Sequence, residues 1–91
     1  MNIIELKNLG PKSKVQLQRI GVHTQQDLEV IGAVRAYFKL KATFPKLSLN
    51  MLYALEGALQ HMHCIDLSQS HKARLLAELD ALEQAQKHLS D

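Results

Sequence analysis

Glycine and proline divide the first half of this chain into short pieces, and this division limits the elements that it can form. The interruptions fall at Gly10-Pro11, Gly21, Gly32 and Pro45. Between them, apolar residues recur every three or four positions, as on one face of an α-helix, and no alternating run is long enough to predict a strand. Leu, Ala, Gln and Lys, which favour helix, are abundant. The sequence therefore predicts an all-α fold built of short helices.

Capping signals indicate five to six helices. Gly21 is a suitable C-terminal stop, because glycine enters the left-handed conformation at low cost. Thr24, with Asp27 three residues later, is close to a capping box. Ser48 and Ser68 are the predicted N-caps of the last two helices. The predicted helices cover residues 3–7, 11 to about 19, 25–31, 33 to about 42, 49 to about 62 and about 69–89.

The predicted helix that follows Ser48 is apolar around nearly its whole circumference. Leu52, Leu55 and Leu59 follow a three-four spacing, and alanine and methionine fill the positions between them. Such a helix is typical of the buried centre of a domain. Glu56 either faces solvent, as we expect of the other carboxylates, or is semi-buried and hydrogen-bonded.

A chain of 91 residues accommodates one domain, which we expect to span residues 1–91. Its 46% hydrophobic and 22% charged residues are typical of globular proteins. No basic segment precedes a long apolar run at the start, and the apolar stretch Met51–Leu55 is far shorter than the roughly 20 residues that cross a bilayer. The single Cys64 cannot form an internal disulfide. We therefore expect a cytoplasmic protein without a membrane segment.

Charge is distributed unevenly along the chain. Residues 1–46 contain eight Lys or Arg and three Asp or Glu, a net charge of +5, whereas residues 47–91 have a net charge of −3. A basic half of this kind favours an anionic partner such as nucleic acid. Two solvated faces that merely differ in charge are the alternative.

The segment from about residue 3 to residue 31 matches a helix-hairpin-helix pattern. Two predicted helices are joined by the turn Asn8-Leu9-Gly10, and the second opens at Pro11. We expect Asn8 and Gly10 to take up the positive φ of the turn, because glycine and asparagine tolerate it best. Leu9 should point inward as an anchor.

The start of the second helix of this hairpin is the predicted nucleic-acid site. Its first backbone N–H groups face outward without partners, where the helix dipole also favours an anion. Lys12 and Lys14 are within reach of the same point, and the Ser13 hydroxyl adds a donor. Together with Asn8 and Gly10, these residues are predicted to hold the phosphate backbone of double-stranded DNA without reading its sequence. The alternatives are a hairpin that only packs two helices and a surface that binds protein.

Histidine and cysteine gather at His61, His63, Cys64 and His71, but we expect neither a metal site nor an enzyme. His61 and His63 are two positions apart and project about 200° apart on a helix, whereas zinc ligands on a helix are spaced by three or four. Exposed histidines and a small buried cysteine are the simpler interpretation. No catalytic triad, phosphate-binding glycine loop or dinucleotide motif is visible, so no cofactor is predicted.

The last predicted helix supports a second hypothesis, a protein-interaction module or homodimer. Leu75, Leu79, Leu82 and Leu89 recur on one side of it and could pack on a second copy of the chain rather than on their own core.

Four strings carry a family resemblance. They are Asn8-Leu-Gly-Pro-Lys-Ser13, Ile20-Gly-Val22, Gly32-Ala-Val34, and Ser48-Leu-Asn50 followed by Leu52-Tyr-Ala-Leu-Glu-Gly-Ala-Leu59. Together they resemble the C-terminal domain of the TfoX/Sxy family, bacterial regulators of natural competence, over about Leu6 to Leu79.

The resemblance implies a small helical domain with a helix-hairpin-helix-like unit. It also implies a role in switching on DNA-uptake genes, as a coactivator working with the cyclic-AMP receptor protein and RNA polymerase. Full-length members carry an N-terminal domain before this one, so the chain is expected to be either a stand-alone relative or an excised domain. Cys64 stands where many relatives have an aromatic residue, which we interpret as a change in packing.

Overall fold

The computed structural model describes residues 9–90, without the side chains of residues 64 and 88–90. Over this part of the chain the fold is all-α, as the sequence predicted. Its elements are α1 (Pro11–Arg19), α2 (Gln25–Ile31), α3 (Ala33–Thr43), α4 (Leu49–Gln60), the 3-10 turn η2 (Cys64–Asp66) and α5 (Gln69–Ser90). The helix predicted over residues 3–7 lies outside the described residues, and with it the first half of the predicted hairpin.

Local signals set the bounds of the first two helices. Gly21 follows α1 with φ +85°, and the Val22 N–H donates to the Leu17 carbonyl at 3.0 Å, which closes the helix end. Thr24 then forms the predicted capping box with Asp27. The Thr24 hydroxyl accepts from the Asp27 N–H at 3.1 Å, and the Asp27 carboxylate accepts from the Thr24 N–H at 3.2 Å.

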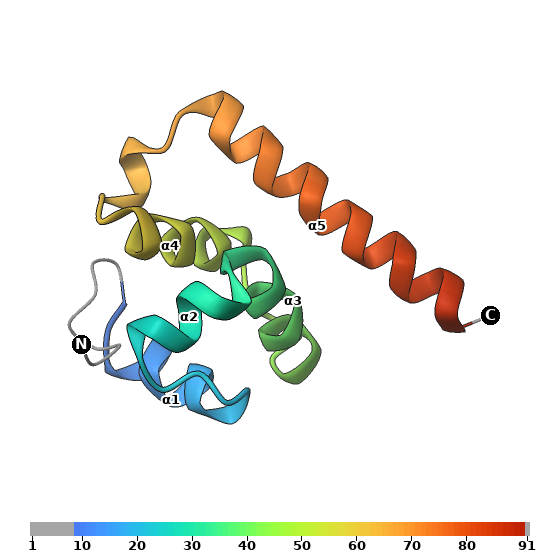
Figure 1. Ribbon diagram of the computed structural model, residues 1–91, viewed down its shortest axis with the longest axis horizontal. Coiled ribbons are helices and arrows are strands. Elements are labelled where there is room, and N and C mark those ends of the chain that lie inside the picture. The colour runs from blue at the N-terminus through green and yellow to red at the C-terminus, as the bar shows by residue number, and fades with distance from the viewer. Residues whose placement is uncertain (1–8, 91) are drawn as a thin grey trace.

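The core is centred on α3 and α4. Figure 1 shows these two helices between α1 and α2 on one side and the long α5 on the other. Leu40 of α3 and Leu52 and Leu55 of α4 are fully buried, which confirms the prediction that the helix after Ser48 lies at the centre of the domain. Each leucine buried in this way contributes about 1.5–3 kcal/mol.

Helix α4 ends at Gln60, two residues before the predicted end. His61 takes up the left-handed conformation with φ +57°, and the Met62 N–H donates to the Gly57 carbonyl at 2.9 Å. This arrangement ends the helix as a glycine usually does, although histidine occupies the position. Ser48 precedes the helix as predicted, but its side chain makes no capping hydrogen bond.

Helix α5 is 22 residues long and packs on α3. Ser68 caps it as predicted, because its hydroxyl accepts from the His71 N–H at 3.1 Å. Leu75 and Leu79 belong to the core, and Leu82 packs against its edge, while residues 83–87 are exposed.

Within residues 9–90, no helix combines the length and the apolar character that crossing a membrane requires.

The backbone conformation of Gly10 differs from the prediction. Its backbone is extended, with φ −114° and ψ −170°, so it does not supply a positive φ to the turn. Gly10 instead is the N-cap of α1, a position that takes an extended conformation. Leu9 beside it is buried, as the anchor role predicted.

The two glycines that flank α1 should respond differently to the same substitution. A Cβ at either position meets no atom within 4 Å, so only the backbone distinguishes them. We expect Gly21→Ser to lower the free energy of unfolding by about 1–2 kcal/mol, because φ is positive there. We expect Gly10→Ser to change it by less than about 0.5 kcal/mol, because serine is a favourable N-cap. Urea unfolding measures both, and equal losses would contradict this assignment of backbone roles.

The capping box also predicts a pH dependence. The His23 N–H donates to the Asp27 carboxylate at 2.9 Å, and this bond, with those from Thr24, lowers the pKa of Asp27 below its ordinary 3.8. The resulting stabilisation is present above pH 3.8 and is lost as the pH falls through the lowered pKa. An NMR titration should therefore find Asp27 below 3.8, and Asp27→Asn should remove this part of the acid dependence. Titration of Asp27 at or above 3.8 would refute the prediction.

Candidate functional site

The N-terminal turn of α1 contains the described part of the predicted nucleic-acid site. Leu9 holds the turn against the core, Gly10 is the N-cap, and Pro11 occupies the first helical turn. The first hydrogen bond of the helix runs from the Lys14 N–H to the Gly10 carbonyl at 3.0 Å. Asn8 lies outside the described residues.

Two backbone donors remain at this turn. The N–H groups of Lys12 and Ser13 precede the first helical hydrogen bond and have no acceptor within the helix. Gly10 has no side chain to cap them, and the first turn contains no acidic residue. The positive end of the helix dipole adds to these donors, so the turn is suited to an anion.

The side chains of the turn point in different directions. Lys12 is exposed, whereas Ser13 and Lys14 are half-buried. Successive residues of an α-helix are about 100° apart, so these three side chains are spread around the turn rather than gathered on one face. Lys12 and Lys14 therefore flank the backbone donors from different sides of the same turn.

One face of α1 contributes to an open groove that the sequence analysis missed. Lys12, Val15, Gln16 and Arg19 share this face because they are spaced by three, four and seven positions. The opposite wall is the connection between α3 and α4. We call this feature the basic groove; its volume is about 770 Å³, and its lining residues are Lys12, Val15, Gln16, Arg19, Thr43, Phe44, Pro45, Lys46 and Leu47.

Hydrogen bonds hold the second wall of the basic groove in shape. The Tyr37 hydroxyl donates to the Leu47 carbonyl at 3.4 Å, and the Lys41 Nζ donates to the same oxygen at 2.5 Å. The Phe44 N–H donates to the Leu40 carbonyl, and the Leu47 N–H donates to the Phe44 carbonyl at 3.1 Å. Burial raises the pKa of the Tyr37 phenol, which keeps it protonated as a donor.

Val15 lies on the groove side of α1 although it is apolar. It is 59% exposed, whereas Leu17 is fully buried. Two residues that are two positions apart project about 200° apart on a helix, so Val15 and Leu17 cannot both face the core. This spacing could have identified Val15 as an exposed apolar residue.

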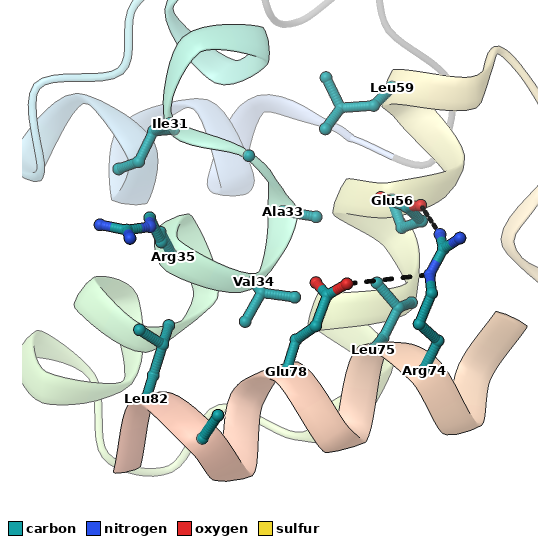
Figure 2. Close-up of a pocket in the computed structure, with 12 residues that line it drawn as sticks. Ile31, Ala33, Val34, Arg35, Glu56, Leu59, Arg74, Leu75, Glu78 and Leu82 are labelled. Carbon is teal, nitrogen blue, oxygen red and sulfur yellow. Dashed lines mark ion pairs between the residues drawn. The ribbon is translucent and has the colours of Figure 1, made fainter. Parts of the chain in front are cut away.

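A second cavity, of about 440 Å³, lies between the junction of α2 and α3 and the facing sides of α4 and α5. Figure 2 shows Arg74 of α5 reaching toward Glu56 of α4 and toward Glu78 on its own helix. Val34, Leu75 and Leu82 form part of the apolar lining of this cavity.

Glu56 is buried at 6% exposure, so of the two sequence alternatives the semi-buried, hydrogen-bonded one is correct. Its Oε2 lies 2.5 Å from His71 Nε2, 3.5 Å from Arg74 Nη2 and 3.4 Å from Gln60 Nε2. Arg74 Nη2 also lies 3.0 Å from His71 Nε2, so the carboxylate, the imidazole and the guanidinium form one hydrogen-bonded cluster. The carboxylate thereby ties α4 to α5, and we interpret the cluster as structural.

Of the predicted histidine and cysteine group, only His71 belongs to this cluster among the described side chains. His61 Nε2 lies 3.3 Å from Gln25 Nε2, and His63 is exposed. The Cys64 side chain lies outside the description. Among the residues described, no three His, Cys, Asp or Glu side chains form a group that could hold a metal ion.

Comparison with known proteins adds a family and a fold. The model of the TfoX C-terminal domain family matches residues 1–79. A crystal structure of an uncharacterised protein from Listeria monocytogenes, in a triclinic form, is 29% identical with a TM-score of 0.82, covering 91% of this chain and 94% of that one. A tetragonal crystal structure of a Listeria monocytogenes protein of unknown function is 28% identical with a TM-score of 0.79, covering 88% and 99%. No curated protein matches the chain.

Substitutions of Glu56 and of its partner His71 should change the free energy of unfolding in a non-additive way. His71→Phe removes the nearest partner of Glu56 and should lower the free energy of unfolding by about 1–3 kcal/mol, because the buried carboxylate loses that hydrogen bond. Adding Glu56→Leu should recover part of this loss, since both polar groups are then replaced. Urea unfolding of the single and double variants tests this coupling, and losses that simply add would contradict it.

Proposed function

Because the chain belongs to the TfoX C-terminal domain family, we propose that it is a non-enzymatic regulatory domain that contacts the backbone of double-stranded DNA through the N-terminal turn of α1. The contact surface consists of the turn residues Asn8, Gly10, Lys12, Ser13 and Lys14. Its place of action is the cytoplasm, where bacterial transcription occurs.

One observation supports this proposal above the others. The backbone N–H groups of Lys12 and Ser13 are unpaired within the helix at its positive end, and the exposed ammonium of Lys12 lies on the same turn. Backbone donors of this kind, with lysine beside them, recognise phosphate oxygens and carry no sequence information. Duplex backbone contact of this form is weak, with Kd of about 10⁻⁴–10⁻⁶ M, and depends on salt.

A weak contact fits a domain that acts within a larger assembly. The family resemblance implies partners among the transcription machinery, namely the cyclic-AMP receptor protein and RNA polymerase. Within such an assembly, a phosphate contact worth little by itself adds to the other contacts through effective concentration. Sequence preference would then come from those partners rather than from α1.

The second candidate function is protein binding without direct DNA contact, and the basic groove favours it because part of its lining is apolar. The homodimer based on the leucines of α5 is less favoured. Leu75 and Leu79 are 2% and 7% exposed, so they pack on their own core rather than on a second copy. Of that predicted face, Leu82 is partly buried, and the Leu89 side chain is outside the described residues.

Charge reversal at the turn tests DNA contact directly. The Lys12→Glu, Lys14→Glu double variant should bind a labelled duplex at least about tenfold more weakly in fluorescence anisotropy, and its binding should depend less steeply on salt. Neither residue is a buried core residue, so circular dichroism should show an unchanged fold.

The matched control is Lys72→Glu with Lys87→Glu, which makes the same change in net charge on α5. It should bind the duplex within about twofold of the unchanged protein. Equal losses in both double variants would show an effect of net charge alone and would refute the site on α1.

A further inference from the structure

We propose that the basic groove binds an acidic amphipathic segment of a partner protein, one with apolar side chains on one face and carboxylates on the rest. This goes beyond the proposed DNA contact. Only Lys12 belongs both to the groove and to the phosphate-binding turn, and the other lining residues have no role in the DNA contact.

The charges of the groove are of one sign. Lys12 and Arg19 lie on the α1 wall and Lys46 lies on the opposite wall, whereas no Asp or Glu lines the groove. Within residues 9–90, the ion pairs join Glu56 to His71 and Arg74, and Arg74 to Glu78, so none of the three groove cations is neutralised. Cations on both walls complement a chain with carboxylates on two sides.

The two walls also bring apolar side chains into the groove between these cations, namely Val15, Phe44, Pro45 and Leu47, and we call this apolar part the floor. Val15 is 59% exposed, Pro45 is exposed, and Phe44 and Leu47 are half-buried. A phosphodiester backbone gains nothing from apolar surface, and a single half-buried aromatic ring provides no stacking platform for bases. An amphipathic peptide uses both properties, because its apolar face covers the floor while its carboxylates meet the rim.

The shape of the groove also suits a short peptide. Its volume of about 770 Å³ is within the range of clefts that enclose ligands. Its second wall is fixed before binding by the bonds from Tyr37 and Lys41 to the Leu47 carbonyl. A preformed wall reduces the ordering that binding would otherwise require.

The experiment uses a synthetic peptide of about twelve residues, with leucine at helical spacing on one face and glutamate elsewhere. Its titration into the isotope-labelled protein should shift the amide resonances of Val15, Gln16, Arg19 and residues 43–47. A peptide with glutamine in place of every glutamate should bind at least about tenfold more weakly. Shifts confined to α5, or no shifts at peptide concentrations of about 1 mM, would overturn the proposal.

Two exposed valines provide matched variants. Val15→Glu places a carboxylate on the groove floor and should weaken binding of the acidic peptide at least about tenfold. Val30→Glu makes the same change at a position on α2 that is 83% exposed and does not line the groove, and it should leave binding unchanged. Equal effects of the two substitutions would overturn the proposal.

The test separates this proposal from the DNA contact. Lys14 does not line the groove, so Lys14→Glu should weaken duplex binding and leave peptide binding intact. Peptide binding that persists when no duplex binds supports the groove and refutes the DNA contact. A duplex that shifts the groove resonances while the peptide does not would refute the protein partner.

Discussion

The packing of α3 against α4 is the interaction on which the rest of the structure depends. Leu40, Leu52 and Leu55 are fully buried within the core that the two helices share. Helix α3 contacts α1, α2, α4 and α5, so each of the other helices is positioned by it. A substitution that opened this contact would therefore displace both walls of the basic groove and the attachment of α5.

The two faces of this platform differ in their chemistry. On one side, the N-terminal turn of α1 and the basic groove present cations and backbone donors that have no partner among the described residues. On the other side, the one charged residue of α4 is satisfied by α5, since Glu56 is bonded to His71 and paired with Arg74. A buried carboxylate without such partners would be strongly unfavourable. The ion pairs among the described residues thus lie between α4 and α5 and within α5, away from the basic groove.

Much of the fold could be predicted because its signals are local. Gly21 and the pair Thr24 and Asp27 each set a helix end through bonds that span a few residues. The left-handed His61 was missed because its sequence carries no glycine at that position. Of the candidate site, the N-terminal turn was predicted, whereas the groove was not, because its second wall is brought to α1 only by tertiary packing.

The most direct test of the central claim is an amide-resolved NMR titration with a short DNA duplex at low salt. The account predicts that the Lys12 and Ser13 amide resonances shift first and furthest, because these N–H groups would bond to phosphate oxygens. The shifts should reverse on addition of salt. Shifts centred on α5, or unchanged Lys12 and Ser13 resonances while the duplex binds, would contradict it.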